Sequence, residues 1–203
     1  MEFKRLAIEG AWIAQSAVHG DERGLFREWF KADEIRHTTG REFDVSQSSL
    51  SLSQRGVLRG IHYSLAPQGQ AKWLTCVSGA IWDVIVDIRP ASPTFKKWVG
   101  VELTSNGGQA ILISEDLGHG FISLEDNSVV SYHLTSPYSP TEEFEIDPLD
   151  PELAIAWPLT KVIMSGKDAT APTLAMRLAE GKLPGTNLQE KGASTSALKN
   201  SVT

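Results

Sequence analysis

Three side chains in the middle of the chain could carry acid–base chemistry: His62, Lys72 and Tyr132. An imidazole titrates near neutrality, which suits a histidine to remove a proton next to a carbonyl group. The ammonium group of a lysine could stabilise the enolate oxygen that this step creates. A phenol on the other side of a cavity could return the proton to the opposite face. With a carboxylate to orient the histidine, this set has the chemistry of epimerisation beside a ketone.

Each of these residues also has an ordinary structural explanation. His62 fits a core histidine whose hydrogen bonds are satisfied, and Lys72 fits a side chain that reaches solvent from the end of a strand. Tyr132 fits a residue that fills a barrel while its hydroxyl is paired. Residue types and spacing alone leave both explanations open.

The elements that must position these residues are strands. Along residues 81–88, side chains alternate between an apolar face and a face that carries Asp83 and Asp87 among isoleucines. Lys72 belongs to the preceding strand, and residues 78–79 form the turn between the two. Polar groups among apolar ones on neighbouring strands are typical of a small barrel with a ligand cavity. A sandwich whose carboxylates face water is the alternative.

Much of the remaining chain also predicts short strands, with few helical patterns. Strands are expected at residues 3–8, 11–18, 25–30, 98–103, 109–113 and 129–134, and a weaker edge strand or polar wall at 43–52. Short helices are expected at residues 31–37 and 171–180. This pattern indicates an all-β sandwich or barrel.

His119 stands between Gly118 and Gly120. Flanking glycines let a backbone approach a ligand closely, or they form a bulge in a strand. The sequence leaves this choice open.

The composition bounds the class of protein. A chain of 203 residues with 41% hydrophobic and 22% charged residues fits one soluble globular domain, which we expect over residues 1–184, with a flexible polar tail over 185–203. The net charge of −6 argues against a general nucleic-acid or anionic-membrane binder, so an anionic ligand needs a local cationic pocket. One cysteine, Cys76, excludes an internal disulfide. Without a transmembrane or signal pattern, we expect a cytoplasmic protein.

Other kinds of active site find little support in the sequence. His62 is followed by Tyr63 and Ser64 rather than by a second histidine, so the close histidine pair of a metal cupin is absent and no metal is expected. The sequence contains no phosphate loop, nucleophile elbow or dinucleotide fingerprint. Cys76 lies in a predicted strand and fits the core better than a nucleophile.

Several motifs resemble those of the dTDP-4-dehydrorhamnose 3,5-epimerase family. The resemblance runs in order over about residues 5–185 and rests on GDERG (20–24), VLRGIHY (57–63), DVIVDIR (83–89), SPTF (92–95), WVGV (98–101), GHGF (118–121) and LAIAWP (153–158). It implies a cupin-type jelly-roll, a homodimer, and an active site without metal or cofactor. The implied reaction converts dTDP-4-dehydro-6-deoxy-D-glucose to dTDP-4-dehydro-L-rhamnose in L-rhamnose biosynthesis.

The resemblance also implies roles for individual residues. His62 matches the family's base, Tyr132 the acid, and Lys72 the lysine at the sugar ketone. Asp168 matches the aspartate that orients the histidine, although it could equally cap the last helix.

A second group of positions matches the family's contacts with the substrate. Arg23 and Arg59 resemble residues that bind the pyrophosphate and sugar, which would supply the local positive pocket. Tyr138 matches the aromatic residue that stacks on thymine. The other matching positions are Phe26, Glu28, Gln47, Ser49, His119, Glu143 and Lys167.

Two departures from the family pattern leave the substrate open. Ser49 stands where an asparagine is common, and Pro137 stands where the residue is often polar or aromatic. One alternative is therefore an epimerase that acts on only C3 or only C5 of a related dTDP-4-keto-6-deoxy sugar. A non-catalytic nucleotide-sugar-binding cupin and a metal-dependent cupin oxygenase are the others.

Overall fold

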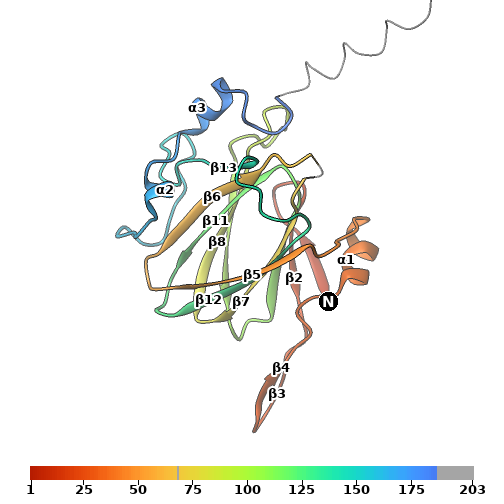
Figure 1. The fold of residues 1–203 in the computed structure, drawn as a ribbon. Coiled ribbons are helices and arrows are strands. Elements are labelled where there is room, and N and C mark those ends of the chain that lie inside the picture. Colours follow the sequence, from red (N-terminus) through yellow and green to blue (C-terminus); the bar gives the residue numbers. More distant parts are fainter. Residues whose placement is uncertain (68, 187–203) are drawn as a thin grey trace, which may run out of the picture.

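Alternating apolar residues fold most of the chain into antiparallel strands (Figure 1). The computed structural model describes residues 1–67 and 69–186. Its strands are β1 Glu2–Arg5, β2 Ala11–Gln15, β3 His19–Asp21, β4 Gly24–Phe26, β5 Gln47–Ser53, β6 Leu58–Ser64, β7 Lys72–Ser78, β8 Ala80–Asp87, β9 Trp98–Thr104, β10 Gln109–Ile113, β11 Leu117–Ser123, β12 Ser128–Leu134 and β13 Glu143–Glu145. Its helices are α1 Ala32–Thr39, α2 Gly166–Ala169 and α3 Leu174–Ala179.

The strands form two facing sheets. The order is β1-β2-β10-β7-β12-β5 in a six-stranded sheet and β13-β6-β11-β8-β9 in a five-stranded sheet. Every pairing in both sheets is antiparallel. The expected all-β, jelly-roll-type fold with few short helices is confirmed.

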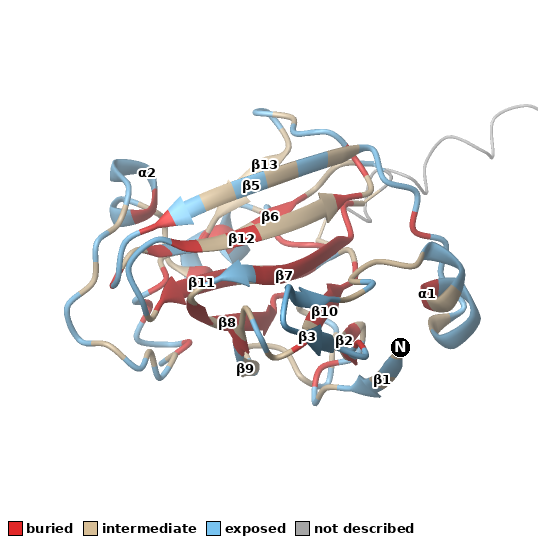
Figure 2. Cartoon of the chain, turned by 90° about the horizontal axis from the view of Figure 1, so that it is seen from below, coloured by how far each residue is buried: buried red, intermediate tan, exposed pale blue. Residues whose placement is uncertain are grey.

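The core lies between the sheets. Leu74 of β7 and Val130 of β12 belong to the same buried cluster as Ile81 and Ile85 of β8, the two isoleucines of the predicted mixed face. Burial is greatest in the middle strands of both sheets (Figure 2). Burial of apolar surface stabilises a fold by about 25 cal/mol per Å² removed from water, so this cluster contributes substantially to stability.

The outer faces of both sheets are also covered. The C-terminal segment packs Leu153, Leu174 and Trp157 against the apolar outer face of β8. On the six-stranded sheet, Ile35 of α1 packs against Trp73. The sheets therefore remain apolar on both faces along much of their length.

The two carboxylates of β8 do not face water, so the sandwich alternative is wrong on this point. Asp83 and Asp87 are both fully buried. Asp87 accepts hydrogen bonds from the side chains of Arg89, Ser92 and Thr94 in the loop after β8. Burial opposes its ionisation, but these hydrogen bonds outweigh that effect and lower the pKa of Asp87 to about 2.

Several element boundaries differ from the prediction. The strand expected at 25–30 ends at Phe26, because β3 and β4 form a separate, exposed hairpin. The helix expected at 171–180 begins only at Leu174, because Pro172 disfavours a helical residue before it and Thr173 caps α3 by accepting a hydrogen bond from the backbone of Met176. The predicted tail falls, from residue 187 onward, outside the described residues. No helix in the described part of the chain is long and apolar enough to cross a membrane.

Candidate active site

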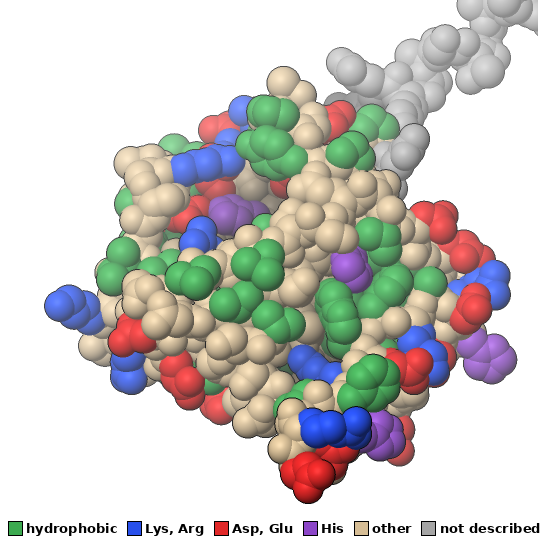
Figure 3. Space-filling view, turned by 60° about the horizontal axis from the view of Figure 1, so that its bottom comes forward, with side chains coloured by type: hydrophobic (Ala, Val, Ile, Leu, Met, Phe, Trp, Pro, Cys, Tyr) green, Lys and Arg blue, Asp and Glu red, His purple; other side chains and the backbone are tan. Residues whose placement is uncertain are grey.

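A cavity of about 350 Å³ opens between the two sheets. Its walls combine apolar side chains such as Leu74 and Phe121 with the polar residues described below. On the face shown in Figure 3, a histidine lies in a hollow with acidic and basic side chains around it. The predicted ligand cavity is therefore present.

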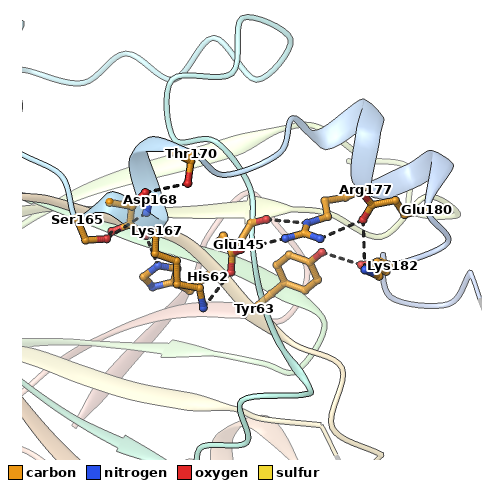
Figure 4. Close-up of polar contacts among 11 residues, drawn as sticks. His62, Tyr63, Glu145, Ser165, Lys167, Asp168, Thr170, Arg177, Glu180 and Lys182 are labelled. Atoms are coloured by element: carbon orange, nitrogen blue, oxygen red, sulfur yellow. Dashed lines mark hydrogen bonds and ion pairs between the residues drawn. The ribbon is translucent and has the colours of Figure 1, made fainter.

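His62 of β6 is held by a carboxylate from α2 (Figure 4). Its Nε2 lies 2.6 Å from Asp168 Oδ1, and Ser165 Oγ donates to Asp168 Oδ2 at 2.9 Å. Burial opposes ionisation of Asp168, but the hydrogen bonds from His62 and Ser165 outweigh it and lower the pKa of this carboxyl. Since an ionised carboxylate can only accept, we assign the imidazole hydrogen to Nε2, which leaves the electron pair on Nδ1 to take a proton.

Asp168 does not cap the last helix. Ser165 is the N-cap of α2 and accepts from the backbone N–H of Asp168, while Thr173 caps α3. The short turn of α2 thus fixes the Asp168 side chain toward His62.

An irregularity in β6 brings Arg59 and His62 to the same cavity although they are three residues apart. The pairing between β6 and β11 shifts register between His119 and Phe121. Gly60 lies at this point with φ of 129°, and an added Cβ there would meet the Cα of Gly120 at 2.5 Å. The glycines around His119 therefore belong to a bulge at which β6 and β11 approach each other closely. Of the two explanations that the sequence left open, the structure supports the bulge.

Lys72 of β7 lies in the cavity wall and is buried. Its Nζ donates to Gln70 Oε1 at 2.6 Å, and Gln70 Nε2 donates to Glu143 Oε1 at 2.8 Å. Burial lowers the pKa of Lys72 to about 8, with Glu143 opposing the shift in part. Gln70 was not among the predicted site residues, because nothing in the sequence pairs this loop residue with a lysine two positions later.

Tyr132 lines the cavity from the wall opposite His62. It belongs to β12 of the six-stranded sheet, whereas His62 belongs to β6 of the five-stranded sheet. Lys72 is on β7, the immediate neighbour of β12, and Tyr132 pairs with Leu74 in that register. The cavity therefore presents an imidazole on one sheet and a phenol and an ammonium on the other.

His119 forms a second histidine–carboxylate pair. Its Nε2 lies 2.7 Å from Asp83 Oδ2, on the strand next to β11. The sequence shows both residues but not this pairing, since it does not reveal the register of β8 against β11.

Further predicted ligand contacts lie toward the mouth of the cavity. Gln47 donates to Ser49 Oγ at 3.0 Å and accepts from the backbone N–H of Tyr138 at 2.9 Å, so Ser49 supports Gln47 without lining the cavity itself. Lys167 lines the cavity beside Asp168 and forms an ion pair of 3.0 Å with Glu145 (Figure 4). That ion-paired hydrogen bond raises the pKa of Lys167.

Three more predicted contacts, besides Ser49, lie outside this chain's own cavity. Arg23 and Phe26 belong to the β3–β4 hairpin, which projects from the body of the molecule (Figure 1), and Glu28 follows it. The side chain of Arg23 is 85% exposed and pairs with Asp21 in the same hairpin, and Phe26 is 65% exposed. The structure therefore does not bring these three residues to the cavity of their own chain.

The described residues, 1–67 and 69–186, contain no group of three or more His, Cys, Asp or Glu side chains that could hold a metal ion. Cys76 is buried in the core cluster as expected, and burial raises the pKa of its thiol to about 11.

Comparison with known proteins shows that the chain is similar to nucleotide-sugar epimerases. Residues 5–176 match the family model described as dTDP-4-dehydrorhamnose 3,5-epimerase. The chain is 45% identical over 185 residues to the dTDP-4-dehydrorhamnose 3,5-epimerase of Mycolicibacterium smegmatis, covering 91% of each protein. It is 44% identical over 180 residues to a dTDP-4-dehydro-6-deoxyglucose 3-epimerase of a Streptomyces species, covering 88% of this chain and 92% of the relative.

A solved structure shows the same fold. It is the dTDP-6-deoxy-D-glucose-3,5-epimerase of Legionella pneumophila Philadelphia 1 in complex with dTDP-4-keto-L-rhamnose. The TM-score is 0.85 at 40% identity, and the match covers 90% of this chain and 97% of the other.

Proposed function

The chain belongs to the dTDP-4-dehydrorhamnose 3,5-epimerase family, and from this membership we propose that it inverts C3 and C5 of dTDP-4-dehydro-6-deoxy-D-glucose. The product is dTDP-4-dehydro-L-rhamnose, a precursor in L-rhamnose biosynthesis. Membership makes the protein an isomerase, and the substrate and the roles of its residues are our proposal.

One observation carries this proposal. His62, already oriented by Asp168, faces the cavity from one sheet, while Tyr132 and Lys72 face it from the other. An epimerase needs a base and an acid on opposite faces of a ring, with a cation at the oxygen between the two reacting carbons. The imidazole therefore lies on one wall of the cavity and the phenol and ammonium lie on the opposite wall, an arrangement that suits this chemistry.

In the first half-reaction, Nδ1 of His62 takes the proton from the carbon beside the C4 ketone. The electron pair of the broken C–H bond moves into the C3–C4 or C4–C5 bond, and the carbonyl oxygen becomes an enolate. The Lys72 ammonium stabilises the negative charge on that oxygen, an electrostatic contribution that is large in a cavity shielded from water. The ionised Asp168 stabilises the imidazolium that forms on His62.

In the second half-reaction, the Tyr132 hydroxyl gives its proton to the same carbon from the opposite face. The configuration of that carbon is thereby inverted, and the ketone is restored. Tyr132 regains a proton from solvent and His62 releases one, so the enzyme returns to its starting state. Because C3 and C5 both flank the ketone, one set of residues can act on each carbon in turn.

The nucleotide is bound by the polar residues toward the cavity mouth. Arg59 and Lys167 supply positive charge for the pyrophosphate in a protein whose net charge is −6. Tyr138, which is 57% exposed at the mouth, supplies an aromatic face for thymine. Gln47, His119 and Glu143 complete the proposed contacts.

A single-centre epimerase is the second candidate, because the Streptomyces relative with 44% identity is named a 3-epimerase. Incubation with dTDP-4-dehydro-6-deoxy-D-glucose in heavy water, followed by NMR, separates the two candidates. We expect deuterium at both C3 and C5, and an L-configured product. Exchange at only one carbon would move the chain to the single-centre class, and binding without exchange would make it a nucleotide-sugar-binding protein.

We also propose that the protein is a homodimer in which the β3–β4 hairpin of each copy reaches the cavity of the other. Leu25 and Phe26 of the hairpin are exposed, as are Leu50 and Leu52 on the outward face of β5. Apolar side chains gather on the face shown in Figure 3, as expected of a surface that a partner covers. A second copy would then supply Arg23 to the cavity, together with Phe26.

Complementation between two inactive variants tests this arrangement. We coexpress a chain carrying Arg23→Ala and Phe26→Ala with a chain carrying His62→Ala. If the hairpin acts in the other copy, each mixed dimer contains one intact site, so random pairing restores about a quarter of wild-type activity. If the hairpin acts within its own chain, no site is intact and the mixture stays inactive, as each variant does alone.

A further inference from the structure

Gln70 is a buried polar residue that the reaction scheme does not yet use. It is 6% exposed and lies in the cavity wall just before β7. Its amide connects two charged side chains: Lys72 Nζ donates to Oε1 at 2.6 Å, and Nε2 donates to Glu143 Oε1 at 2.8 Å. Nε2 also approaches the backbone carbonyl of Ser136 at 3.5 Å.

The chemistry of the neighbours fixes the orientation of this amide. An ammonium group can only donate hydrogen bonds and an ionised carboxylate can only accept them. The amide oxygen must therefore face Lys72, and the amide nitrogen must face Glu143. In this orientation the amide separates the two charges and gives the ammonium a neutral acceptor.

This separation matters because Lys72 is the cation that we propose for stabilisation of the enolate. A lysine that pairs directly with a carboxylate has its charge neutralised and its hydrogens turned toward that partner. With an amide as its partner, the ammonium uses one of its three hydrogens there and keeps the other two for a ligand.

Other charged or titratable groups face the same cavity. They are Arg59 and His62 from β6, His119 from β11, Tyr132 from β12, Tyr138 from the loop after β12, Glu143 from β13 and residues 167–168 from α2. Of these, Glu143 acts on Lys72 and raises its pKa, yet burial has the larger effect and the pKa remains near 8.

We propose that Gln70 is a positioning residue for the reaction: its amide directs the Lys72 ammonium at the substrate's carbonyl oxygen and keeps the Glu143 carboxylate one side chain away. This inference rests on the proposed epimerase activity. Gln70 does not touch the reacting atoms and acts through Lys72.

A Gln70→Glu variant tests the inference with a side chain of nearly the same shape. The new carboxylate contacts Lys72 on one side and Glu143 on the other. If the two carboxyl groups share a proton, Glu143 donates it and the negative charge lies on residue 70, beside Lys72, so the pKa of Lys72 rises. Lys72 acts as the ammonium, so activity is lost as the pH increases through this pKa, and the loss moves to higher pH. We expect kcat at neutral pH to fall roughly 10- to 100-fold, less than the 10²–10³ that follows deletion of an oxyanion donor. The alkaline limb of kcat should move from near pH 8 upward by about one unit or more, with the affinity for dTDP unchanged.

Two further variants separate positioning from folding. Gln70→Met removes the amide without adding charge and should also lower kcat while dTDP still binds. Gln54→Glu makes the same charge change at an exposed residue that bonds to Asn127, and should leave kcat and the pH profile as in the wild type. A folded Gln70→Glu protein with wild-type kcat and an unchanged alkaline limb would overturn the inference. A parallel loss of dTDP affinity and melting temperature with an unchanged pH profile would overturn it as well, since it would indicate a purely structural role.

A direct titration keeps this inference separate from the proposed function. NMR of the Lys72 Nζ group follows its pKa without any substrate. If the wild type fails to exchange hydrogen at C3 or C5, the epimerase assignment fails. If the wild type is active but the pKa of Lys72 is the same in Gln70→Glu, only the role of Gln70 fails.

Discussion

A His62→Ala variant is expected to lose solvent exchange at both carbons beside the ketone, by a factor of roughly 10²–10⁴. The reason is that one base serves both positions, so C3 and C5 should lose exchange together. The affinity for dTDP should remain, because the nucleotide contacts lie toward the mouth of the cavity. The measurement is deuterium incorporation by NMR, with dTDP binding followed by calorimetry.

The alanine variant also removes a partner from the buried carboxylate of Asp168, which is 4% exposed. His62→Gln is the matched variant, because its amide nitrogen can take the place of Nε2 and keep the hydrogen bond while it cannot act as a base. It should be as inactive as His62→Ala and closer to the wild type in stability. His37→Ala, on the exposed face of α1, is the control and should be fully active. Exchange retained at either carbon in both His62 variants would assign the base elsewhere, with His119 as the next candidate.

A Tyr132→Phe variant is expected to separate proton removal from inversion. Only the hydroxyl is lost, while the ring still packs against the core cluster between the sheets. His62 can still remove a proton and, after exchange with solvent, return deuterium to the same face. We therefore expect deuterium washed into unreacted substrate while the formation of epimerised product falls by roughly 10²–10⁴.

Tyr63→Phe is the control for this variant. Tyr63 is fully buried on the opposite side of β6, and its hydroxyl donates to the backbone carbonyl of Lys182 at 2.7 Å. Its loss should cost about 1 kcal/mol of stability and leave both exchange and inversion intact. Normal product formation by Tyr132→Phe would show that another group supplies the proton.

The strands and their faces were predictable because a half-buried strand displays its environment with a period of two. The alternation over residues 81–88 places Ile81 and Ile85 in the inner cluster and Val84 and Val86 in the outer one, as expected. The strand over Gln109–Ile113 agrees with the prediction at both ends, because the Asn106-Gly107-Gly108 segment before it is a strong turn signal.

The acid–base set was predictable in type but not in arrangement. The sequence contains Asp83 and His119, but their contact depends on the register of β8 against β11. Arg59 and His62 share a cavity only because β6 is irregular at Gly60, and simple alternation would place them on opposite faces. The link from Lys72 through Gln70 to Glu143 joins residues far apart in the chain, and no local pattern indicates it.

The hairpin illustrates a different limit. The resemblance implies that Arg23 and Phe26 are ligand contacts, whereas in the single chain both are exposed on the projecting hairpin and neither lines the cavity. A contact that forms only between two copies leaves no trace in the hydrophobic pattern of one chain.

The most direct test of this account is a crystal structure of the protein with its dTDP-4-keto sugar bound. We expect the sugar ring to lie between His62 of β6 and Tyr132 of β12, with the C4 oxygen within about 3 Å of Lys72 Nζ. A ring bound outside the space between these three side chains, or a C4 oxygen directed away from Lys72, would contradict the proposed mechanism.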